Sequence, residues 1–263
     1  MLEQVAEPPD PAAVRSFVAV GDSFSEGVGD PRADGAGCRG WADRVAGRLA
    51  AGSPGLRYAN LAIRGKMLGE VITEQVPSAV AMRPDLVSIA AGGNDLLRPG
   101  GDPDELAEPF DGAVAQLAAA AGRVMVFTGF NPGTFPVIRL IRGKVAAYNA
   151  HLRIIAARHD CLLVDLWSMR ILRDPALWCD DRLHLGPEGH RRVALRVCEV
   201  LGVPAGADWR APVPAAAEPR WLARRRADAQ WARTYAAPWL RRRLTGASSG
   251  DGMAPKRPDL LPF

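Results

Sequence analysis

The sequence lacks the patterns that mark disulfide frameworks, zinc clusters and membrane spans. Its 263 residues contain four cysteines, which lie far apart and form no Cys-x-x-Cys pair. This spacing argues against a zinc cluster and fits free thiols better than disulfides. No apolar run reaches the roughly 20 residues that a membrane-spanning helix needs. Residues 1–14 are acidic and proline-rich, without the basic start and apolar core of a secretory signal, so we expect a cytoplasmic protein.

Most of the chain has no large excess of positive or negative charge. Hydrophobic residues make up 48% and charged residues 24%, as in ordinary globular proteins. Residues 217–263 hold ten Lys/Arg and four Asp/Glu, a net charge of +6. Because the total is +4, the remainder of the chain carries −2. The basic character therefore belongs to the tail.

What is present is an alternation of β-prone apolar runs and helical segments. Several runs are almost continuously apolar, which is typical of strands covered on both faces. The predicted strands are residues 16–20, 57–61, 86–90, 124–128 and 162–166. Apolar residues at helical spacing predict helices over 41–51, 104–121, 145–158 and 187–201. Such alternation predicts an α/β sandwich.

The chain divides into a body and a basic tail. Residues 1–203 form the predicted α/β domain, 204–219 a Pro/Ala-rich linker, and 220–263 a Trp/Arg-rich extension. A helix is expected to begin at Trp221. Ala227, Trp231, Tyr235 and Trp239 follow one another at intervals of four residues. This spacing predicts an aromatic stripe along one side of the helix.

A serine on a turn follows the first predicted strand. Gly21-Asp22-Ser23-Phe24-Ser25 comes directly after the apolar run. In open α/β sheets, ligands bind at the carboxyl ends of the strands. A nucleophilic serine needs a base, a carboxylate that orients the base, and donors for the oxyanion. A phosphate-binding loop is a weak alternative, because no Gly-Lys-Ser/Thr follows and Glu26 and Asp30 would repel phosphate.

The base is best supplied by His184, which lies after the fifth predicted strand. Asp181 precedes it by three residues, so its carboxylate can turn back onto the imidazole. The other histidines, His151, His159 and His190, lie on or at the end of predicted helices. We expect each of those to be a surface or packing residue.

Oxyanion donors are expected after the second and third strands. Gly65 allows a peptide N–H to approach a ligand closely. Asn94 lies in a Gly-Gly-Asn-Asp turn that brings a carboxamide toward the strand ends. Taken alone, each position is an ordinary turn residue. Together with Ser23, Asp181 and His184, they all follow strands at one edge of the predicted sheet.

These blocks resemble those of the SGNH hydrolase superfamily, the GDSL-type esterases and lipases. The resemblance covers about residues 16–202 and rests on four ordered blocks. They contain Ser23 in Gly-Asp-Ser-Phe, Gly65 in Asn-x4-Gly, Asn94 in Gly-x-Asn-Asp, and His184 in Asp-x-x-His. Phe24 replaces the usual leucine, and Gly186 separates Leu185 from Pro187 where some relatives have proline directly after the histidine.

The resemblance implies a fold and a set of roles. The fold is a flavodoxin-like three-layer α/β/α sandwich with a five-stranded parallel sheet, here followed by a helical basic C-terminal extension. Ser23 would be the nucleophile, His184 the base and Asp181 the orienting acid. The oxyanion hole would comprise the backbone N–H groups of Ser23 and Gly65 and the side chain of Asn94. No metal or cofactor is expected.

The predicted function is a carboxylic ester hydrolase (EC 3.1.1.-) that forms an acyl-enzyme on Ser23 with a small-molecule ester. The same triad would also serve an O-deacetylase of carbohydrates or natural products, or an acyltransferase. A non-catalytic binding protein is disfavoured by the intact Ser23, His184 and Asp181.

The tail has three interpretations. A helix that docks its tryptophans on the body is favoured over an interfacial helix that approaches anionic lipid or acyl substrates. Nucleic-acid binding is not expected, because an arginine-rich stretch alone is weak evidence for it.

Overall fold

A six-stranded sheet forms the centre of the computed structural model, which describes residues 7–35, 37–133, 138–214, 221–238, 241 and 248–263. The strand order is β5-β4-β3-β1-β2-β6. Five strands are parallel: β1 (Ser16–Gly21), β2 (Arg57–Asn60), β3 (Leu86–Ala90), β4 (Arg123–Phe127) and β5 (Leu162–Val164). They confirm the predicted parallel sheet, although β5 ends at Val164 rather than at residue 166.

The sheet has one strand more than predicted, and this strand comes from the tail. β6 (Arg257–Pro262) pairs antiparallel with β2, so that Tyr58 lies opposite Leu261. Its residues are exposed or only partly buried and include two prolines. Proline is tolerated on edge strands. Because this segment has neither a continuous apolar run nor a clear alternation, its sequence pattern did not predict a strand.

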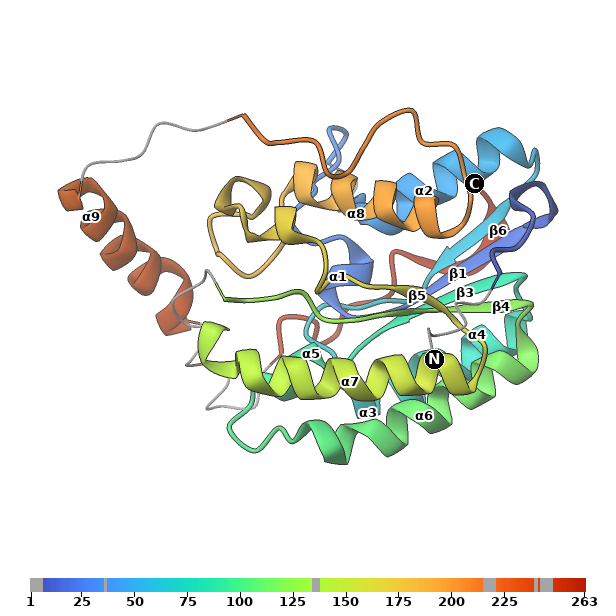
Figure 1. The fold of residues 1–263 in the computed structure, drawn as a ribbon, viewed down its shortest axis with the longest axis horizontal. Helices are drawn as coiled ribbons and strands as arrows, with labels where there is room; N and C mark the ends of the chain where they lie inside the picture. The colour runs from blue at the N-terminus through green and yellow to red at the C-terminus, as the bar shows by residue number, and fades with distance from the viewer. Residues whose placement is uncertain (1–6, 36, 134–137, 215–220, 239–240, 242–247) are drawn as a thin grey trace.

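Helices cover both faces of the sheet, as Figure 1 shows. α2 (Gly40–Gly52) and α8 (Pro187–Val200) pack together on one face. The other face is covered by α4 (Val76–Met82), α6 (Pro103–Ala120) and α7 (Arg142–Arg158). The three-layer α/β/α architecture is therefore confirmed.

Side chains alternate across β1 and divide the core into two apolar clusters. Phe17 and Ala19 belong to the cluster that includes α2 and α8. Val18 and Val20 belong to the cluster that includes α4, α6 and α7. A strand that is buried on both faces needs apolar residues at every position, which explains the continuous run that the sequence shows.

Short helical segments follow the strands and form the loops at their ends. α1 (Ser23–Glu26) follows β1, α3 (Leu68–Glu70) comes after β2, and α5 (Gly93–Leu96) comes after β3. The remaining single turns are Pro11–Ala13, Val71–Gln75, Ile138–Ile141, Arg170–Arg173 and Pro175–Leu177.

The tail contains a helix as predicted. α9 (Trp221–Trp231) continues into a wider helical turn, Ala232–Ala236, and lies at one end of the molecule in Figure 1. Trp239, the last member of the expected aromatic stripe, is outside the described residues. In the part of the chain that the structure describes, every helix is too short or too polar to cross a membrane.

Candidate active site

The turn that carries Ser23 is fixed by its neighbours in the core. Gly21, the last residue of β1, has a φ of 145°. A side chain there would place its Cβ 2.3 Å from the carbonyl oxygen of Ala90. The peptide of Gly21 makes two buried hydrogen bonds with Gln75: its N–H donates to Oε1 at 2.8 Å, and its C=O accepts from Nε2 at 2.9 Å. These contacts therefore hold the backbone just before Ser23, the first residue of α1.

Ser23, His184 and Asp181 form one chain of hydrogen bonds. The Nε2 atom of His184 lies 3.1 Å from the hydroxyl oxygen of Ser23, and its Nδ1 atom lies 2.6 Å from Oδ2 of Asp181. Because the carboxylate accepts the hydrogen on Nδ1, Nε2 is left as the acceptor that faces the serine hydroxyl. This is the arrangement required for a histidine base.

Asp181 is held in its charged form by the loop around it. Its Oδ1 atom accepts backbone N–H groups of Leu183 at 2.9 Å and of His184 at 3.0 Å. Partial burial acts to raise the pKa of Asp181, but the hydrogen bonds and charge of His184 outweigh it and hold this pKa below its usual value. The carboxylate consequently stays ionised and continues to orient the imidazole.

Gly65 lies in a loop that is held on both sides. Before it, Glu26 of α1 accepts the backbone N–H of Arg64 at 2.7 Å and also pairs with the guanidinium of Arg64. After it, Asp95 of α5 accepts the backbone N–H of Leu68 at 3.0 Å. Two carboxylates from neighbouring strand ends thus fix the backbone that contains Gly65.

The side-chain amide of Asn94 donates hydrogen bonds to protein oxygens. Nδ2 lies 3.0 Å from the carbonyl oxygen of Lys66 and 3.2 Å from Oδ2 of Asp22. Burial raises the pKa of Asp22 to about 6, and the hydrogen bond from the N–H of Phe24 only partly opposes this. Asn94 therefore connects the Ser23 turn with the Gly65 loop, and its donation to an oxyanion stays a prediction.

All five residues predicted for the site line one cavity. Ser23, Gly65, Asn94, Asp181 and His184 surround a space of about 620 Å³. The structure therefore brings together residues from four separate segments of the sequence.

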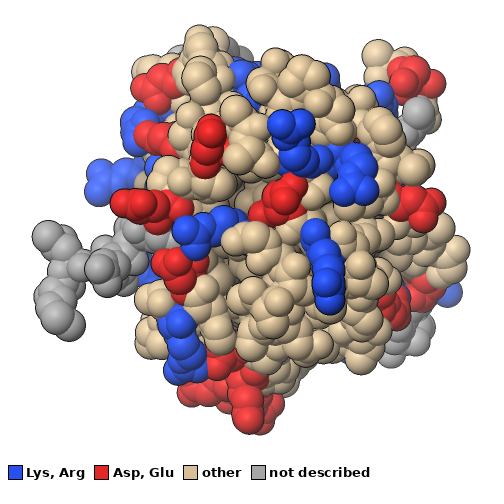
Figure 2. Space-filling view, turned by 90° about the vertical axis from the view of Figure 1, so that its right-hand side faces the viewer, with Lys and Arg blue, Asp and Glu red and all other residues tan. Residues whose placement is uncertain are grey.

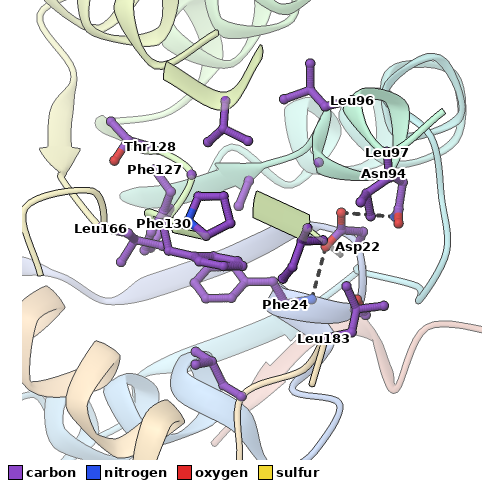
Figure 3. A pocket seen from close by; sticks show the side chains of 18 of the residues that line it. Asp22, Phe24, Asn94, Leu96, Leu97, Phe127, Thr128, Phe130, Leu166 and Leu183 are labelled. Carbon is purple, nitrogen blue, oxygen red and sulfur yellow. Dashed lines mark hydrogen bonds between the residues drawn. The ribbon is translucent and has the colours of Figure 1, made fainter. Parts of the chain in front are cut away.

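A second, smaller cavity of about 180 Å³ also opens at Ser23, and its walls are mostly apolar. In Figure 3, Phe127, Phe130 and Leu166 lie on one side of it, and Leu97, Asn94 and Asp22 on the other. The side chain of Phe24 also lines this space. Ser23 and His184 border both cavities, so a molecule bound at Ser23 can extend in two directions.

The remaining histidines lie outside the hydrogen-bond chain. His151 pairs with Asp104, and His159 pairs with Asp111. His190 is buried, where Nδ1 accepts the N–H of Trp41 at 3.3 Å and Nε2 donates to the carbonyl oxygen of Val28 at 3.0 Å. These are the surface and packing positions that the sequence predicts.

Metal-ligand clusters and the charge pattern of one face bear on two other classes of function. Within the described ranges, no three His, Cys, Asp or Glu residues gather in a way that could hold a metal ion. On the side of the molecule that Figure 2 shows, basic and acidic side chains are interspersed. That face therefore offers no basic stripe of the kind that tracks nucleic acid.

Several residues that shape the site have no local sequence signal. Gln75 lies 54 positions from Gly21, and Glu26 lies 38 positions from Arg64. Trp231 donates from its indole nitrogen to the backbone oxygen of Asp181 at 2.9 Å, across 50 positions. The aromatic stripe in the tail was the only indication that this tryptophan would pack on the body.

Comparisons with known proteins agree with the family that the sequence blocks resemble. The family model described as the GDSL-like lipase/acylhydrolase family matches residues 19–192. LAE5, an alpha/beta hydrolase from the metagenome of Lake Arreo, is 24% identical, with a TM-score of 0.62 over 73% of this chain and 96% of its own. Axe2, an acetylxylan esterase from Geobacillus stearothermophilus, is 23% identical, with a TM-score of 0.60 over 74% and 95%. No curated protein matches in sequence. The chain belongs to the GDSL-like lipase/acylhydrolase family.

Proposed function

We propose that this ester hydrolase works as a serine enzyme, with a covalent acyl-enzyme on Ser23. The observation that carries the proposal is the unbroken chain of hydrogen bonds from Asp181 through His184 to Ser23. Its placement where two cavities meet gives an ester room on both sides of the nucleophile.

The acylation step uses the residues as follows. The hydroxyl oxygen of Ser23 bonds to the acyl carbon while its proton passes to Nε2 of His184. The N–H groups of Ser23 and Gly65 and the amide of Asn94 stabilise the oxyanion, each such donor lowering the barrier by about 3–4 kcal/mol. The alkoxide then leaves and takes the proton from His184, while Asp181 stabilises the transient imidazolium.

Deacylation repeats these steps with water. His184 takes a proton from a water molecule, whose oxygen bonds to the acyl carbon. Collapse of the intermediate breaks the bond to Ser23 and returns the proton to its hydroxyl. The acid is released, and the protein returns to its starting state without a metal or cofactor.

The apolar cavity fits the acyl part of the ester. Its volume of about 180 Å³ exceeds the roughly 150 Å³ of an engineered apolar cavity that binds benzene, so it can hold an aliphatic chain of about six carbons. Leu166, Phe127 and Phe130 would contact such a chain. Axe2 is named for acetyl esters, but an acetyl group would leave most of this space unfilled, and we therefore favour a longer acyl group.

The test compares two neighbouring serines. Ser23→Ala should abolish turnover of p-nitrophenyl hexanoate, and a fluorophosphonate should label the wild type but not this variant. Ser25→Ala is the matched control, since the buried Ser25 hydroxyl has no hydrogen-bond partner among the described residues. Full activity in Ser23→Ala would overturn the mechanism. A clear preference for acetyl over hexanoyl esters would instead favour the deacetylase alternative.

A further inference from the structure

We propose that the C-terminal extension builds a subsite for the alcohol part of the ester, an inference that rests on the proposed function. The alcohol subsite is the cavity of about 620 Å³ beside Ser23 and His184. The extension contributes Trp231, Tyr235 and Ser248 to its wall. The residues of the extension lie beyond residue 192, where the match to the family model ends.

The first part of the extension is attached to the catalytic loop. The indole N–H of Trp231 donates to the backbone oxygen of Asp181 at 2.9 Å. Arg182 forms an ion pair with Asp228 of α9 at 2.7 Å, and its guanidinium lies 5.1 Å from the centre of the Trp231 ring. α9 therefore contacts both Asp181 and the residue that follows it.

The second part of the extension crosses the Gly65 loop. A Cβ on Gly65 would lie 2.2 Å from the hydroxyl oxygen of Ser248, so the two segments are in direct contact. Gly250 is buried, and a Cβ there would lie 2.0 Å from the carbonyl oxygen of Arg64. Ser248 is thus held next to a predicted oxyanion donor.

The end of the extension anchors this crossing in the sheet. Lys256 is mostly buried and lies 2.8 Å from a carboxylate oxygen of Asp43 on α2. Its ammonium group also donates to the carbonyl oxygen of Arg39 at 2.7 Å. β6 follows at once and pairs with β2. The segment around Ser248 is therefore fixed from its C-terminal side.

The position of the cavity identifies the part of the substrate that it takes. His184 borders both cavities and can return a proton to an alcohol in either. Because the apolar cavity is assigned to the acyl chain, the alcohol takes the other one, which Asp181 and Gly65 also line. Thr234, Tyr235 and Ser248, which carry hydroxyl groups, line this space together with apolar residues such as Leu140. Hydroxyl-bearing residues beside aromatic and aliphatic ones fit a bulky alcohol that carries both hydroxyl groups and apolar faces, such as a glyceryl or sugar unit.

This placement has a specific kinetic consequence. The alcohol leaves the protein before water attacks the acyl-enzyme, so contacts with the alcohol affect acylation and cannot affect hydrolysis of the acyl-enzyme. By microscopic reversibility, the same contacts assist transfer of the acyl group to an added alcohol. In that reaction, the oxygen of the alcohol bonds to the acyl carbon, the bond to Ser23 breaks, and the hydroxyl proton passes through His184 to Ser23.

The test uses the full-length double variant Tyr235→Ala/Ser248→Ala. Its kcat/KM for glyceryl and glucosyl hexanoates should fall about tenfold relative to methyl hexanoate, since two wall contacts are removed. Deacylation of the hexanoyl-enzyme, followed in single turnover, should stay within about twofold of wild type. Transfer of the hexanoyl group to added glycerol should fall in parallel. Trp221→Ala is the control, because that side chain is 67% exposed and lies outside the cavity.

The outcomes separate this inference from the proposed function. If Ser23→Ala is inactive but the double variant keeps the wild-type ranking of alcohols, the alcohol subsite is wrong and the serine mechanism stands. If the double variant slows deacylation as much as acylation, the extension acts on the catalytic loop and not on the alcohol. If Ser23→Ala remains active, the proposed function fails first.

Discussion

The nucleophile and the base of this site are held in different ways. Ser23 follows a buried strand, and Gly21 at the end of that strand makes two buried hydrogen bonds with Gln75. His184 and Asp181 lie in a half-buried loop that contacts Trp231 and Asp228 of the tail. The nucleophile therefore depends on the core of the domain, whereas the base depends in part on a segment added to it.

This difference predicts unequal sensitivity to substitution. Loss of one partner of a buried hydrogen bond costs about 1–3 kcal/mol. An exposed ion pair such as Arg182–Asp228 contributes at most about 1 kcal/mol. Changes near Ser23 should therefore affect stability, and changes in the tail should affect activity while leaving stability almost unchanged.

The largest effect is expected for Asp181→Asn. Because Oδ1 must still accept the N–H groups of Leu183 and His184, the new amide nitrogen would face Nδ1 of the imidazole. This favours the tautomer with its hydrogen on Nε2, which cannot accept the serine proton. We expect kcat to fall about 10³- to 10⁴-fold at unchanged melting temperature. A loss below tenfold would show that another carboxylate, such as Asp180, orients His184.

Substitution of Gln75 tests whether the buried core holds the Ser23 turn. Gln75→Leu removes both hydrogen bonds to Gly21 and deprives its buried N–H of this acceptor, whereas the C=O of Gly21 still accepts the N–H of Ile63 at 3.3 Å. The free energy of unfolding should decrease by about 2–4 kcal/mol, measured by urea denaturation. Gln116→Leu, on an exposed surface of α6, is the matched control and should change stability by less than about 0.5 kcal/mol. Equal effects of the two variants would contradict a clamped Ser23 turn.

The pH dependence of stability also tests the buried core, through the titration of His190. Burial lowers the pKa of His190 to about 4 from the usual 6.5. Between these values the unfolded chain binds a proton that the folded protein does not, so stability falls as the pH falls from 6.5 to 4. The contribution is about 3 kcal/mol. His190→Gln should retain both hydrogen bonds and lose this dependence, so its decrease in stability over that range should be smaller by that amount.

The smallest effect is expected for Trp231→Phe, which tests the tail side. The variant keeps an aromatic ring beside Arg182 and loses the hydrogen bond to the backbone of Asp181. One such bond is worth about 1 kcal/mol, so kcat/KM should fall about fivefold with little change in melting temperature. Trp221→Phe, on the exposed side of α9, should leave both unchanged. A large loss of stability in Trp231→Phe would mean that the tail is part of the core.

The body of the fold could be predicted because its signals are local. Each buried strand is an apolar run, and Ser23, Gly65 and Asn94 each follow such a run within a few positions. Parallel strands align their carboxyl ends at one edge, so Ser23, Gly65 and Asn94 could be expected to meet there. The cavity that they share with Asp181 and His184 agrees with this expectation.

The supporting residues could not be predicted in the same way. Gln75 and Glu26 act on the peptides of Gly21 and Arg64, and the distances in sequence leave no periodic pattern to detect. The antiparallel pairing of β6 depends on backbone groups of β2, which any sequence possesses. Such contacts are set by the assembled fold, so no short stretch of sequence contains them.

The antiparallel strand β6 also has a consequence for handling of the protein. Without it, β2 would present a free row of backbone N–H and C=O groups beside an apolar core. Exposed edges of this kind recruit strands from other molecules. Residues 257–262 thus cover the edge of β2, and fusions or truncations that disturb them are expected to lower the solubility of the protein before they alter its chemistry.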